Sequence, residues 1–407
     1  MKPAADRRAF LVVLDSVGIG GAPDAALFGD EGANTIGHVA ETCARGTAGA
    51  GRDGPLHLPN MAALGLGRAL AAASDHPGPL PDMPQRGSWA AATEHSAGKD
   101  TPTGHWELAG VPVPWRWHVF PDEVPALPAE ISRRIAELAG SDGVLGNCHA
   151  SGTEIIRRLG AEHVKTGRPI VYTSADSVIQ IAAHEESFGL ARLLELCAGL
   201  APQAHAMRVG RVIARPFTGT PESGFRRTGN RRDFAIAPPE PTLLDRALAA
   251  GRTTHAVGKI GDIFAHRGIT HEHKAPGRGD AGLFAILLDL AERAAPGSLV
   301  FANLVEFDSE YGHRRDVAGY ARHLEWFDAA LPALLARLGP GDLLVITADH
   351  GNDPTWRGSD HTRERTPVLI HGAGRADLGL CRFVDVDATV ARWLAVPPGP
   401  HGTDLLG

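Results

Sequence analysis

The sequence has 407 residues, of which 43% are hydrophobic and 21% charged, and its formal net charge at pH 7 is −7. A chain of this length is long for one hydrophobic core, so we expect two domains. The negative charge excludes a general attraction to nucleic acid or to an acidic membrane, so an anionic substrate needs a local cluster of cations or metal. Four scattered cysteines without a CxxC spacing argue against a disulfide framework and favour a reducing compartment.

The N-terminal segment does not have the pattern of a signal peptide. Its apolar run Phe10–Leu14 is cut off by Asp15 after five residues, whereas a signal sequence needs about seven or more. No stretch approaches the roughly 20 apolar residues of a membrane helix. We therefore expect a cytoplasmic protein that contacts neither membrane nor nucleic acid, and the sequence leaves its oligomeric state open.

Several short apolar runs end abruptly in polar or acidic residues, as strands buried on both faces of a parallel sheet do. In chain order these runs are Phe10–Leu14 before Asp15, Ile170–Tyr172 before Ser174, Leu299–Val305 before Asp308 and Leu343–Ile346 before Asp349. Segments with a helical pattern alternate with them, namely Leu283–Ala294, His323–Leu338 and Asp387–Leu394. The alternation predicts an α/β fold in which a largely parallel sheet lies between layers of helices.

The middle of the chain differs in composition from the rest. From about Trp115 to Pro238 it is rich in Arg and Pro and has fewer long apolar runs. Prolines cluster at both ends of this section, as they often do in linkers. We therefore expect residues 115–238 to form a smaller α+β cap domain, inserted into a core that is made of residues 1–114 and 239–407.

Three aspartates follow apolar runs at positions where α/β sheets gather their ligands, beyond the carboxyl ends of the strands. They are Asp15, Asp308 and Asp349. Each of them alone could be a helix N-cap or a turn residue. Three together at strand ends, two of them with histidines close by, favour a shared site.

Four segments carry the candidate chemistry, and they supply three carboxylates, three imidazoles and a hydroxyl. These groups belong to Asp15, to the polar segment Gly98–Glu107, to Asp308 with His313, and to Asp349 with His350 and His361. Oxygen and nitrogen ligands without thiolate suit Mn²⁺, Zn²⁺ or Mg²⁺, and equal numbers of carboxylates and histidines favour Mn²⁺. Because seven ligands exceed what one tetrahedral ion takes, the set predicts two ions sharing a site.

The segment Gly98–Glu107 has neither helical nor strand periodicity. It could be a surface loop with an N-cap threonine. Alternatively, it places a threonine nucleophile at the start of a helix, where backbone N–H groups favour phosphate. Two metal ions would lower the pKa of such a hydroxyl and hold the attacking and leaving oxygens of a phosphoryl transfer. His105 could support this nucleophile or be structural.

The chain resembles the phosphopentomutase family of the alkaline-phosphatase-like superfamily. The resemblance rests on six segments in the same order: Asp15–Gly20, Gly29–Thr35, Lys99–Glu107, Tyr172–Ser177, Tyr311–Asp316 and Asp360–Glu364. It implies an alkaline-phosphatase-like core, a mobile cap and two Mn²⁺ ions. It also implies the interconversion of ribose 1-phosphate and ribose 5-phosphate, and of the 2-deoxyribose equivalents.

Carried over by motif, the resemblance implies that Thr101 is the phosphorylated nucleophile. One ion would be held by Asp15, Asp349 and His350, and the other by Asp308, His313 and His361. Ser174 and Asp176 would meet the sugar. We expect the reaction to run through a sugar bisphosphate, which would also be needed to activate the unphosphorylated enzyme.

Basic residues are plentiful for holding the distal phosphate of a phosphopentose. Arg211 and Lys259 are the candidates, because they are close to apolar or glycine-containing segments. The run Arg226–Arg232 could instead be a solvated loop.

Other functions stay open at this point. A phosphoglycerate mutase-like enzyme or a phosphomonoesterase would use the same core, although the segment Thr173–Asp176 favours a pentose. The Asp and His residues could also form a metal site in a non-catalytic protein. Structural metal sites are usually closed and rich in cysteine, which counts against that alternative.

Overall fold

The structure is a computed structural model that describes residues 6–49, 51–74, 78–174 and 176–407. It divides into two compact units, one made of Met1–Pro114 with Pro238–Gly407 and the other of Trp115–Ala237. We call them the core unit and the inserted unit. The division lies one residue from the expected boundary between 238 and 239. That the inserted unit acts as a cap stays a prediction.

The core unit is built on an eight-stranded sheet with the order β10-β9-β11-β1-β12-β13-β2-β14. Its strands are β1 (Arg8–Leu14), β2 (Ser88–Thr93), β9 (Thr254–Val257), β10 (His271–His273), β11 (Leu299–Leu304), β12 (Asp342–Thr347), β13 (Thr366–His371) and β14 (Asp377–Arg382). Neighbours pair in parallel except that β13 is antiparallel to both β12 and β2. The predicted, largely parallel sheet is confirmed, and the apolar runs predicted around residues 10, 300 and 344 form β1, β11 and β12.

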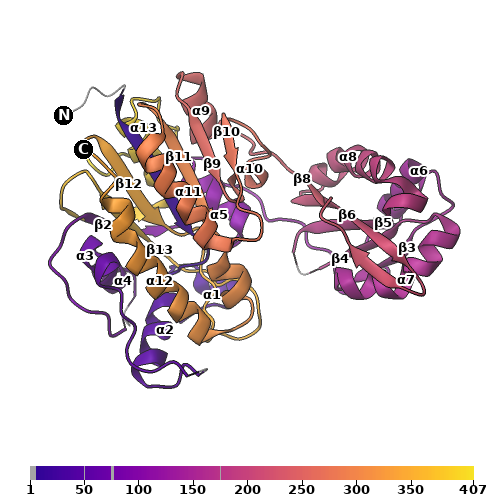
Figure 1. The fold of residues 1–407 in the computed structure, drawn as a ribbon, viewed down its shortest axis with the longest axis horizontal. Helices are drawn as coiled ribbons and strands as arrows, with labels where there is room; N and C mark the ends of the chain where they lie inside the picture. The colour runs from indigo at the N-terminus through magenta and orange to yellow at the C-terminus, as the bar shows by residue number, and fades with distance from the viewer. Residues whose placement is uncertain (1–5, 50, 75–77, 175) are drawn as a thin grey trace. The chain divides into compact units, whose positions relative to one another are not determined.

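Helices cover both faces of this sheet (Figure 1). They are α1 (Ala25–Phe28), α2 (Thr35–Ala44), α3 (Pro59–Leu64), α4 (Leu66–Ala73), α5 (Thr101–Leu108), α9 (Leu243–Ala249), α10 (Ile260–Ile263), α11 (Gly279–Arg293), α12 (Val317–Leu335), α13 (Phe383–Trp393) and the π-helix η3 (Phe307–Gly312). Phe10, Val12 and Leu14 pack with α2, α3, α4, α11 and α12 on one face. The alternate residues of β1 are buried towards the face that α13 contacts. Burial on both faces explains why the run is apolar without alternation.

The inserted unit has a sheet of its own, with the order β3-β4-β5-β6-β7 and with β8 paired to β6. Its elements are α6 (Ala129–Ala139), β3 (Leu145–His149), α7 (Gly152–Thr166), β4 (Ile170–Thr173), β5 (Val178–His184), η2 (Glu185–Gly189), α8 (Leu190–Ala206), β6 (Arg211–Thr220), β7 (Gly224–Arg227) and β8 (Arg232–Ala235). The run Ile170–Tyr172, which we grouped with the strands of the parallel sheet, forms β4 of this mixed sheet. It is apolar because Val171 packs with α6 and α8 while its neighbours pack with α7.

The carboxyl ends of three parallel strands meet at one edge of the core sheet. β1 lies between β11 and β12, with Leu14 opposite Leu304 and Val13 opposite Thr347. Asp15 follows β1 directly, while the segments after β11 and β12 lead into η3 and into the loop with Asp349. The register of the sheet therefore brings three distant stretches of sequence together.

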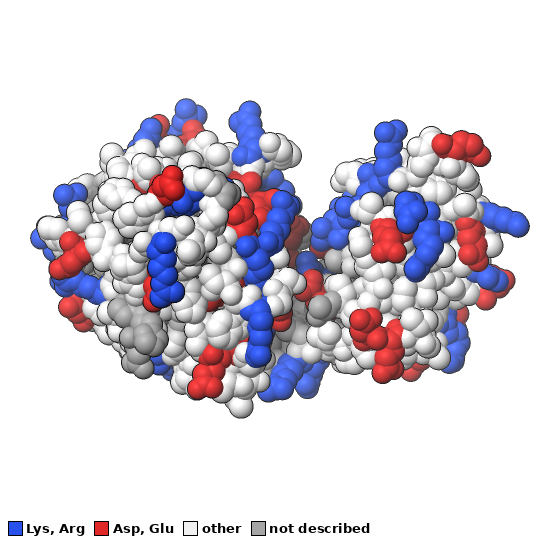
Figure 2. Space-filling view, turned by 90° about the horizontal axis from the view of Figure 1, so that it is seen from below, with Lys and Arg blue, Asp and Glu red and all other residues white. Residues whose placement is uncertain are grey.

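The surface carries both signs of charge. Figure 2 shows acidic and basic side chains interspersed on the face that it draws, as the modest net charge of −7 leads one to expect. Among the helices of the described residues, none is long and apolar enough to cross a bilayer.

Candidate metal centre and catalytic threonine

The first group of candidate ligands surrounds one ring nitrogen of His350. His350 Nε2 lies 3.3 Å from Asp349 Oδ2 and 3.5 Å from Asp15 Oδ1. The hydroxyl oxygen of Thr101 lies 3.3 Å from the same nitrogen. The two aspartates and the histidine are buried, and Thr101 is half-buried. Two carboxylates, an imidazole and a hydroxyl thus converge at the carboxyl ends of the parallel strands.

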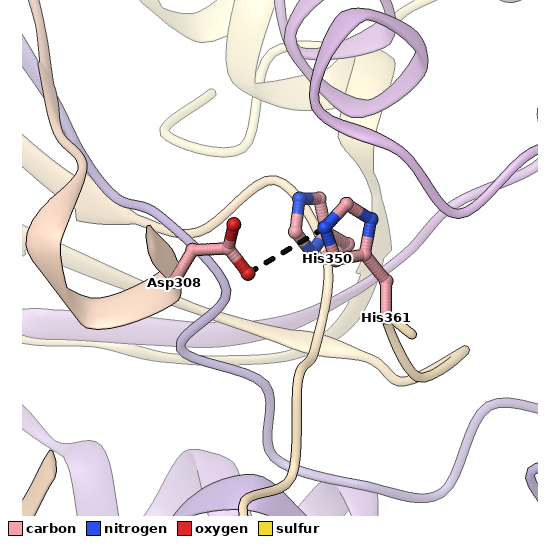
Figure 3. A group of neighbouring side chains, drawn as sticks. All are labelled: Asp308, His350 and His361. Carbon is pink, nitrogen blue, oxygen red and sulfur yellow. Dashed lines mark ion pairs between the residues drawn. The ribbon is translucent and has the colours of Figure 1, made fainter. Parts of the chain in front are cut away.

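The second group surrounds Asp308 in η3. His313 Nε2 lies 3.1 Å from Asp308 Oδ2, and His361 Nε2 lies 3.5 Å from Asp308 Oδ1. The two ring nitrogens are 3.2 Å apart. The rings of His350 and His361 stack with their centroids 3.9 Å apart, so the two groups are contiguous. Figure 3 shows these stacked rings, with Asp308 directed at His361.

Each of the three imidazoles is held through its other ring nitrogen. The Nδ1 atoms lie 2.6 to 3.1 Å from backbone carbonyl oxygens, with the pairs His350 to Gly351, His313 to Ser359 and His361 to Lys99. Because a carbonyl oxygen only accepts hydrogen bonds, Nδ1 is the donor in each pair. Nε2 is therefore the nitrogen that faces the cluster, which is how metal-binding histidines are usually oriented.

The aspartates of the first group keep oxygens available for a cation. Asn303 Nδ2 donates to Asp15 Oδ2 at 3.0 Å, and the backbone N–H of Ser16 donates to Asp349 Oδ1 at 3.1 Å. Asp15 Oδ1 has no hydrogen-bond donor among the described residues. Asp349 Oδ2 lies 3.0 Å from His105 Nδ1, and that nitrogen also bonds to the carbonyl oxygen of Thr101. Leaving such atoms without a partner is costly, and a divalent ion would satisfy them. The residues present therefore fit a divalent metal.

The charges at the site depend strongly on one another. Burial, and then the like charges of Asp349 and Asp308, raise the pKa of Asp15 well above its ordinary value. Burial lowers the pKa of His350 to about 4, so this imidazole is neutral at neutral pH. At His361 burial acts in the same direction, but the Asp308 carboxylate outweighs it and raises the pKa to about 10. Without metal, the protonated imidazole of His361 forms an ion pair with the Asp308 carboxylate. A bound cation would displace the proton from this imidazole.

Thr101 is the first residue of α5, as expected for a threonine at the start of a helix. Asp100 caps this helix by accepting a hydrogen bond of 3.1 Å from the backbone N–H of Thr103. The hydroxyl of Thr103 donates to the same carboxylate at 2.7 Å. Of the two threonines in this turn, Thr101 is therefore the one whose hydroxyl faces the candidate ligands.

His105, whose role the sequence leaves open, lies behind the first group. Its Nδ1 is 2.9 Å from the carbonyl oxygen of Thr101 and 3.0 Å from Asp349 Oδ2. The side chain is fully buried. His105 thus connects the first turn of α5 to a candidate metal ligand and supports both.

Two asparagines that were not among the predicted site residues contact candidate ligands. Asn303 bonds to Asp15, and Asn352 Nδ2 donates to Asp308 Oδ1 at 2.7 Å. Asn303 lies inside β11, where only its polarity within a buried apolar strand could have drawn attention to it. Asn352 follows His350 by two residues, and this proximity is its only signal.

Asp280, at the start of α11, holds the segment that leads to Asp308. Its carboxylate accepts hydrogen bonds from the backbone N–H groups of Val305, at 2.9 Å, and Glu306, at 3.0 Å. His323 Nε2 lies 2.9 Å from the same carboxylate. Asp280, Glu306 and His323 are close enough to hold an ion, but the backbone donors already satisfy both oxygens of Asp280. The three residues are therefore explained without an ion: Asp280 holds the loop after β11 in place through these hydrogen bonds.

The four predicted substrate-binding residues lie in different units. Lys259 is an exposed residue of the core unit, and its charge opposes the effect of burial on the pKa of Asp15, so it lies within electrostatic range of the site. Ser174, Asp176 and Arg211 belong to the inserted unit, where Ser174 and Asp176 follow β4 and Arg211 begins β6. Their contact with a substrate stays a prediction.

Comparison with known proteins identifies the family. Residues 7–397 match the model of the Metalloenzyme superfamily. A protein of Rhizobium johnstonii named phosphopentomutase is 56% identical over 407 residues, which cover 98% of this chain and 100% of that protein. Another of that name, from Methylorubrum extorquens, is 58% identical over 398 residues, which cover 96% of this chain and 98% of the relative. The chain belongs to the phosphopentomutase family.

Membership of this family confirms the predicted enzyme class, a phosphotransferase of the isomerase type, and the predicted metal dependence in its general form. It does not favour the alternatives, which were a phosphoglycerate mutase-like enzyme, a phosphomonoesterase and a non-catalytic metal-binding protein. Among solved structures, phosphoglycerate mutase of Leishmania mexicana aligns over 100% of this chain and 98% of its own, with 15% identity and a TM-score of 0.45.

Proposed function

We propose that this chain interconverts ribose 1-phosphate and ribose 5-phosphate, and the 2-deoxyribose equivalents, by way of a phosphorylated Thr101. The observation that carries the proposal is the position of the Thr101 hydroxyl, 3.3 Å from His350 Nε2 and at the N-terminus of α5. A nucleophile at this point is next to the candidate ligands and to backbone N–H groups that favour a phosphoryl group.

Phosphoryl transfer asks the protein mainly for positioning and charge neutralisation. In the first half-reaction the bond between Thr101 Oγ1 and phosphorus breaks, a bond forms from phosphorus to the free hydroxyl of the sugar monophosphate, and the hydroxyl proton passes to Thr101. In the second, Thr101 takes the other phosphate of the bisphosphate by the reverse steps. Enzyme without phosphate on Thr101 would need a sugar bisphosphate as activator.

Seven side chains of the core unit have roles in this proposal. Asp15, Asp349 and His350 would hold one ion, and Asp308, His313 and His361 the other; Thr101 lies beside the first. Bound divalent ions, for which the mixed carboxylate and imidazole set favours Mn²⁺, would neutralise the charge of the transferring phosphoryl group. The buried Oδ1 of Asp15, which lacks a hydrogen-bond donor among the described residues, supports this assignment.

We further propose that Ser174 and Asp176 bind the sugar and that Arg211 and Lys259 bind its distal phosphate. The exposed ammonium group of Lys259, within range of Asp15, supports a role in attracting an anion to the site. A mutase must keep water away from its phosphothreonine, and closure of the inserted unit as a cap would do so. A cytoplasmic location is part of this proposal, and the scattered cysteines without a disulfide framework support it.

Replacement of Thr101 tests the proposal. Thr101→Ala should lower the conversion of ribose 1-phosphate by roughly 10³-fold or more, because the nucleophile is lost. Its bound metal, measured by mass spectrometry of the elements, should stay within error of the wild type. Thr103→Ala is the matched control, since it removes the neighbouring hydroxyl and should keep turnover within about tenfold of the wild type.

Two results would contradict the proposal. An unchanged rate in Thr101→Ala would remove this residue from the mechanism. Release of inorganic phosphate faster than isomerisation by the Mn²⁺-loaded wild type would show a phosphatase instead of a mutase.

A further inference from the structure

A second cluster of histidines lies on the edge strands of the core sheet, outside the candidate metal centre. β10 is the last strand of the sheet and lies beside β9 (Figure 1). The two strands pair in parallel, with His271 opposite His255. Side chains alternate along a strand, so His273 faces the same side as His271. Three imidazoles therefore share one face of two neighbouring strands.

The nitrogen atoms of two of these rings are spaced as ligands of one ion would be. His255 Nδ1 lies 3.1 Å from His273 Nε2. Two nitrogens bound to one tetrahedral ion at 2.0–2.1 Å are about 3.3 Å apart. The pair His313 and His361 of the candidate metal centre, with nitrogens 3.2 Å apart, shows the same spacing.

The third ring lies beside this pair, but it has to turn before its nitrogen atoms can share an ion with the other two rings. The ring of His271 stacks beside that of His255 with centroids 5.1 Å apart. His271 is exposed, so its side chain can rotate towards the other two rings. After this rotation, two histidines of one strand and one of the adjacent strand would supply three ligands and leave a fourth position for water.

The electrostatic state of the cluster suits metal binding. Burial, and then the proximity of His273 and His271, lower the pKa of His255 to about 4, and burial also lowers the pKa of His273. Neutral imidazoles are the form that binds metal.

We propose that His255, His271 and His273 form a separate cation site, which takes a divalent ion that prefers imidazole nitrogen. An all-nitrogen set without a carboxylate suits Zn²⁺, Ni²⁺ or Cu²⁺ better than Mn²⁺ or Mg²⁺. The candidate metal centre, with its three carboxylates, has the opposite preference. A bound ion would link the short edge strand β10 to β9 and so stabilise this edge of the sheet.

Zinc titration tests the proposal with the full-length protein loaded with Mn²⁺. The probe is Zn²⁺ alone, and the readout is the number of zinc and manganese ions that stay bound after dialysis. Zinc that displaces manganese from the candidate metal centre will do so equally in all variants. The wild type should therefore bind one more zinc ion per chain than the double variant His271→Gln/His273→Gln.

Two single variants make the result specific. His266→Gln changes a neighbouring exposed histidine that bonds to Glu272, and it should bind as much zinc as the wild type. His271→Gln changes only an exposed side chain, so it should fold normally and weaken the additional zinc at least tenfold. Equal zinc content in the wild type, His271→Gln and the folded double variant would overturn the proposal and show that the cluster is only a hydrogen-bonded pair with a neighbour.

Discussion

At the scale of single residues, the candidate ligands are held in position by hydrogen-bond partners, most of which are distant in sequence and come close only in the folded chain. Each of the three imidazoles is fixed by a backbone carbonyl, and Asp15 and Asp308 each accept a hydrogen bond from an asparagine. Such partners orient a ligand before metal arrives, and their loss typically weakens metal binding 10- to 100-fold.

Replacement of Asp280 tests whether residues around the candidate ligands support metal binding. Asp280→Ala frees the backbone N–H groups of Val305 and Glu306 and should let the segment that carries Asp308 move. We expect the affinity for Mn²⁺ at one of the two bound ions to fall at least about tenfold. Equilibrium dialysis against Mn²⁺ measures this effect independently of turnover.

Asp328 of α12 provides a matched control. It is equally buried, and it accepts hydrogen bonds from the backbone N–H groups of Asn60 and Met61 at 3.2 and 2.7 Å. Asp328→Ala should therefore lower stability much as Asp280→Ala does and leave the affinity for Mn²⁺ unchanged. If both variants lose metal equally, Asp280→Ala acts through a general loss of stability, and the hydrogen bonds of Asp280 do not position Asp308 for metal binding.

Residues of this kind mark the limit of what the sequence predicts. That the three aspartates lie close together could be predicted because each follows an apolar run, and the position of Thr101 at a helix start because of the segment around it; their roles stay a prediction. The contacts of Asn303 and Asp280 could not be predicted, because their hydrogen-bond partners are 288 and 25 residues away in sequence. No local sequence pattern indicates such a bond. A buried polar residue within a strand or at a helix start is the only hint.

At the scale of elements, the contact between α5 and the loop after β12 sets the position of the nucleophile. A Cβ added at Gly104 of α5 would overlap the backbone carbonyl of Asp349. The helix can approach this closely only because residue 104 lacks a side chain. The spacing of Thr101 and His350 therefore depends on a glycine that has no chemistry of its own.

Gly104→Ala should push α5 away from the loop that carries Asp349 and His350. Alanine is the better helix former by about 1 kcal/mol, but overpacking against the backbone should outweigh this gain and destabilise the fold by about 1–3 kcal/mol. Turnover should fall as well, because Thr101 moves with the helix. Thermal unfolding and a rate measurement on the same preparation test both effects.

Gly67 is the corresponding control. It lies in α4, and the nearest atom to a Cβ added there is Leu80 Cβ at 3.9 Å. Gly67→Ala should leave turnover unchanged and should keep or slightly raise stability. Normal stability and turnover in Gly104→Ala would mean that α5 has room to shift, and that the close approach does not hold the nucleophile in place.

Most elements near the site could be predicted from hydrophobic pattern alone, since β1, β11 and β12 are apolar runs buried on both faces. The same pattern is misleading at Ile170–Tyr172, which forms β4 of the inserted unit. A strand covered on both faces in a mixed sheet has the same composition as one in a parallel sheet, so hydrophobic pattern does not distinguish them. Strand direction depends on connections between elements, which a short run does not encode.

At the scale of the whole molecule, the chain consists of two units with separate hydrophobic cores. The composition of residues 115–238 indicated this division, because prolines mark both ends of the insertion. The seven proposed residues around the ions all lie in the core unit, while Ser174, Asp176 and Arg211 lie in the inserted unit. Ion binding should therefore act on one unit alone.

Calorimetry can test this independence. We expect two unfolding transitions in the metal-free protein. At a free Mn²⁺ concentration about 100 times the dissociation constant, each of the two proposed ions adds roughly 2.7 kcal/mol to the folded core unit, so that both add about 5.4 kcal/mol. This should raise its Tm by about 5–10 °C and leave the transition of the inserted unit in place. A single transition, or an equal shift of both, would show that the two units unfold as one.

The most direct test of the account is to find the phosphate on the enzyme. After incubation with a pentose 1,5-bisphosphate, trypsin should release the peptide Asp100–Arg116, which contains both Thr101 and Thr103. Fragmentation of this peptide in the mass spectrometer distinguishes the two residues. We predict one phosphate, on Thr101. An active enzyme that carries its phosphate on another residue, or that carries none, would contradict the account.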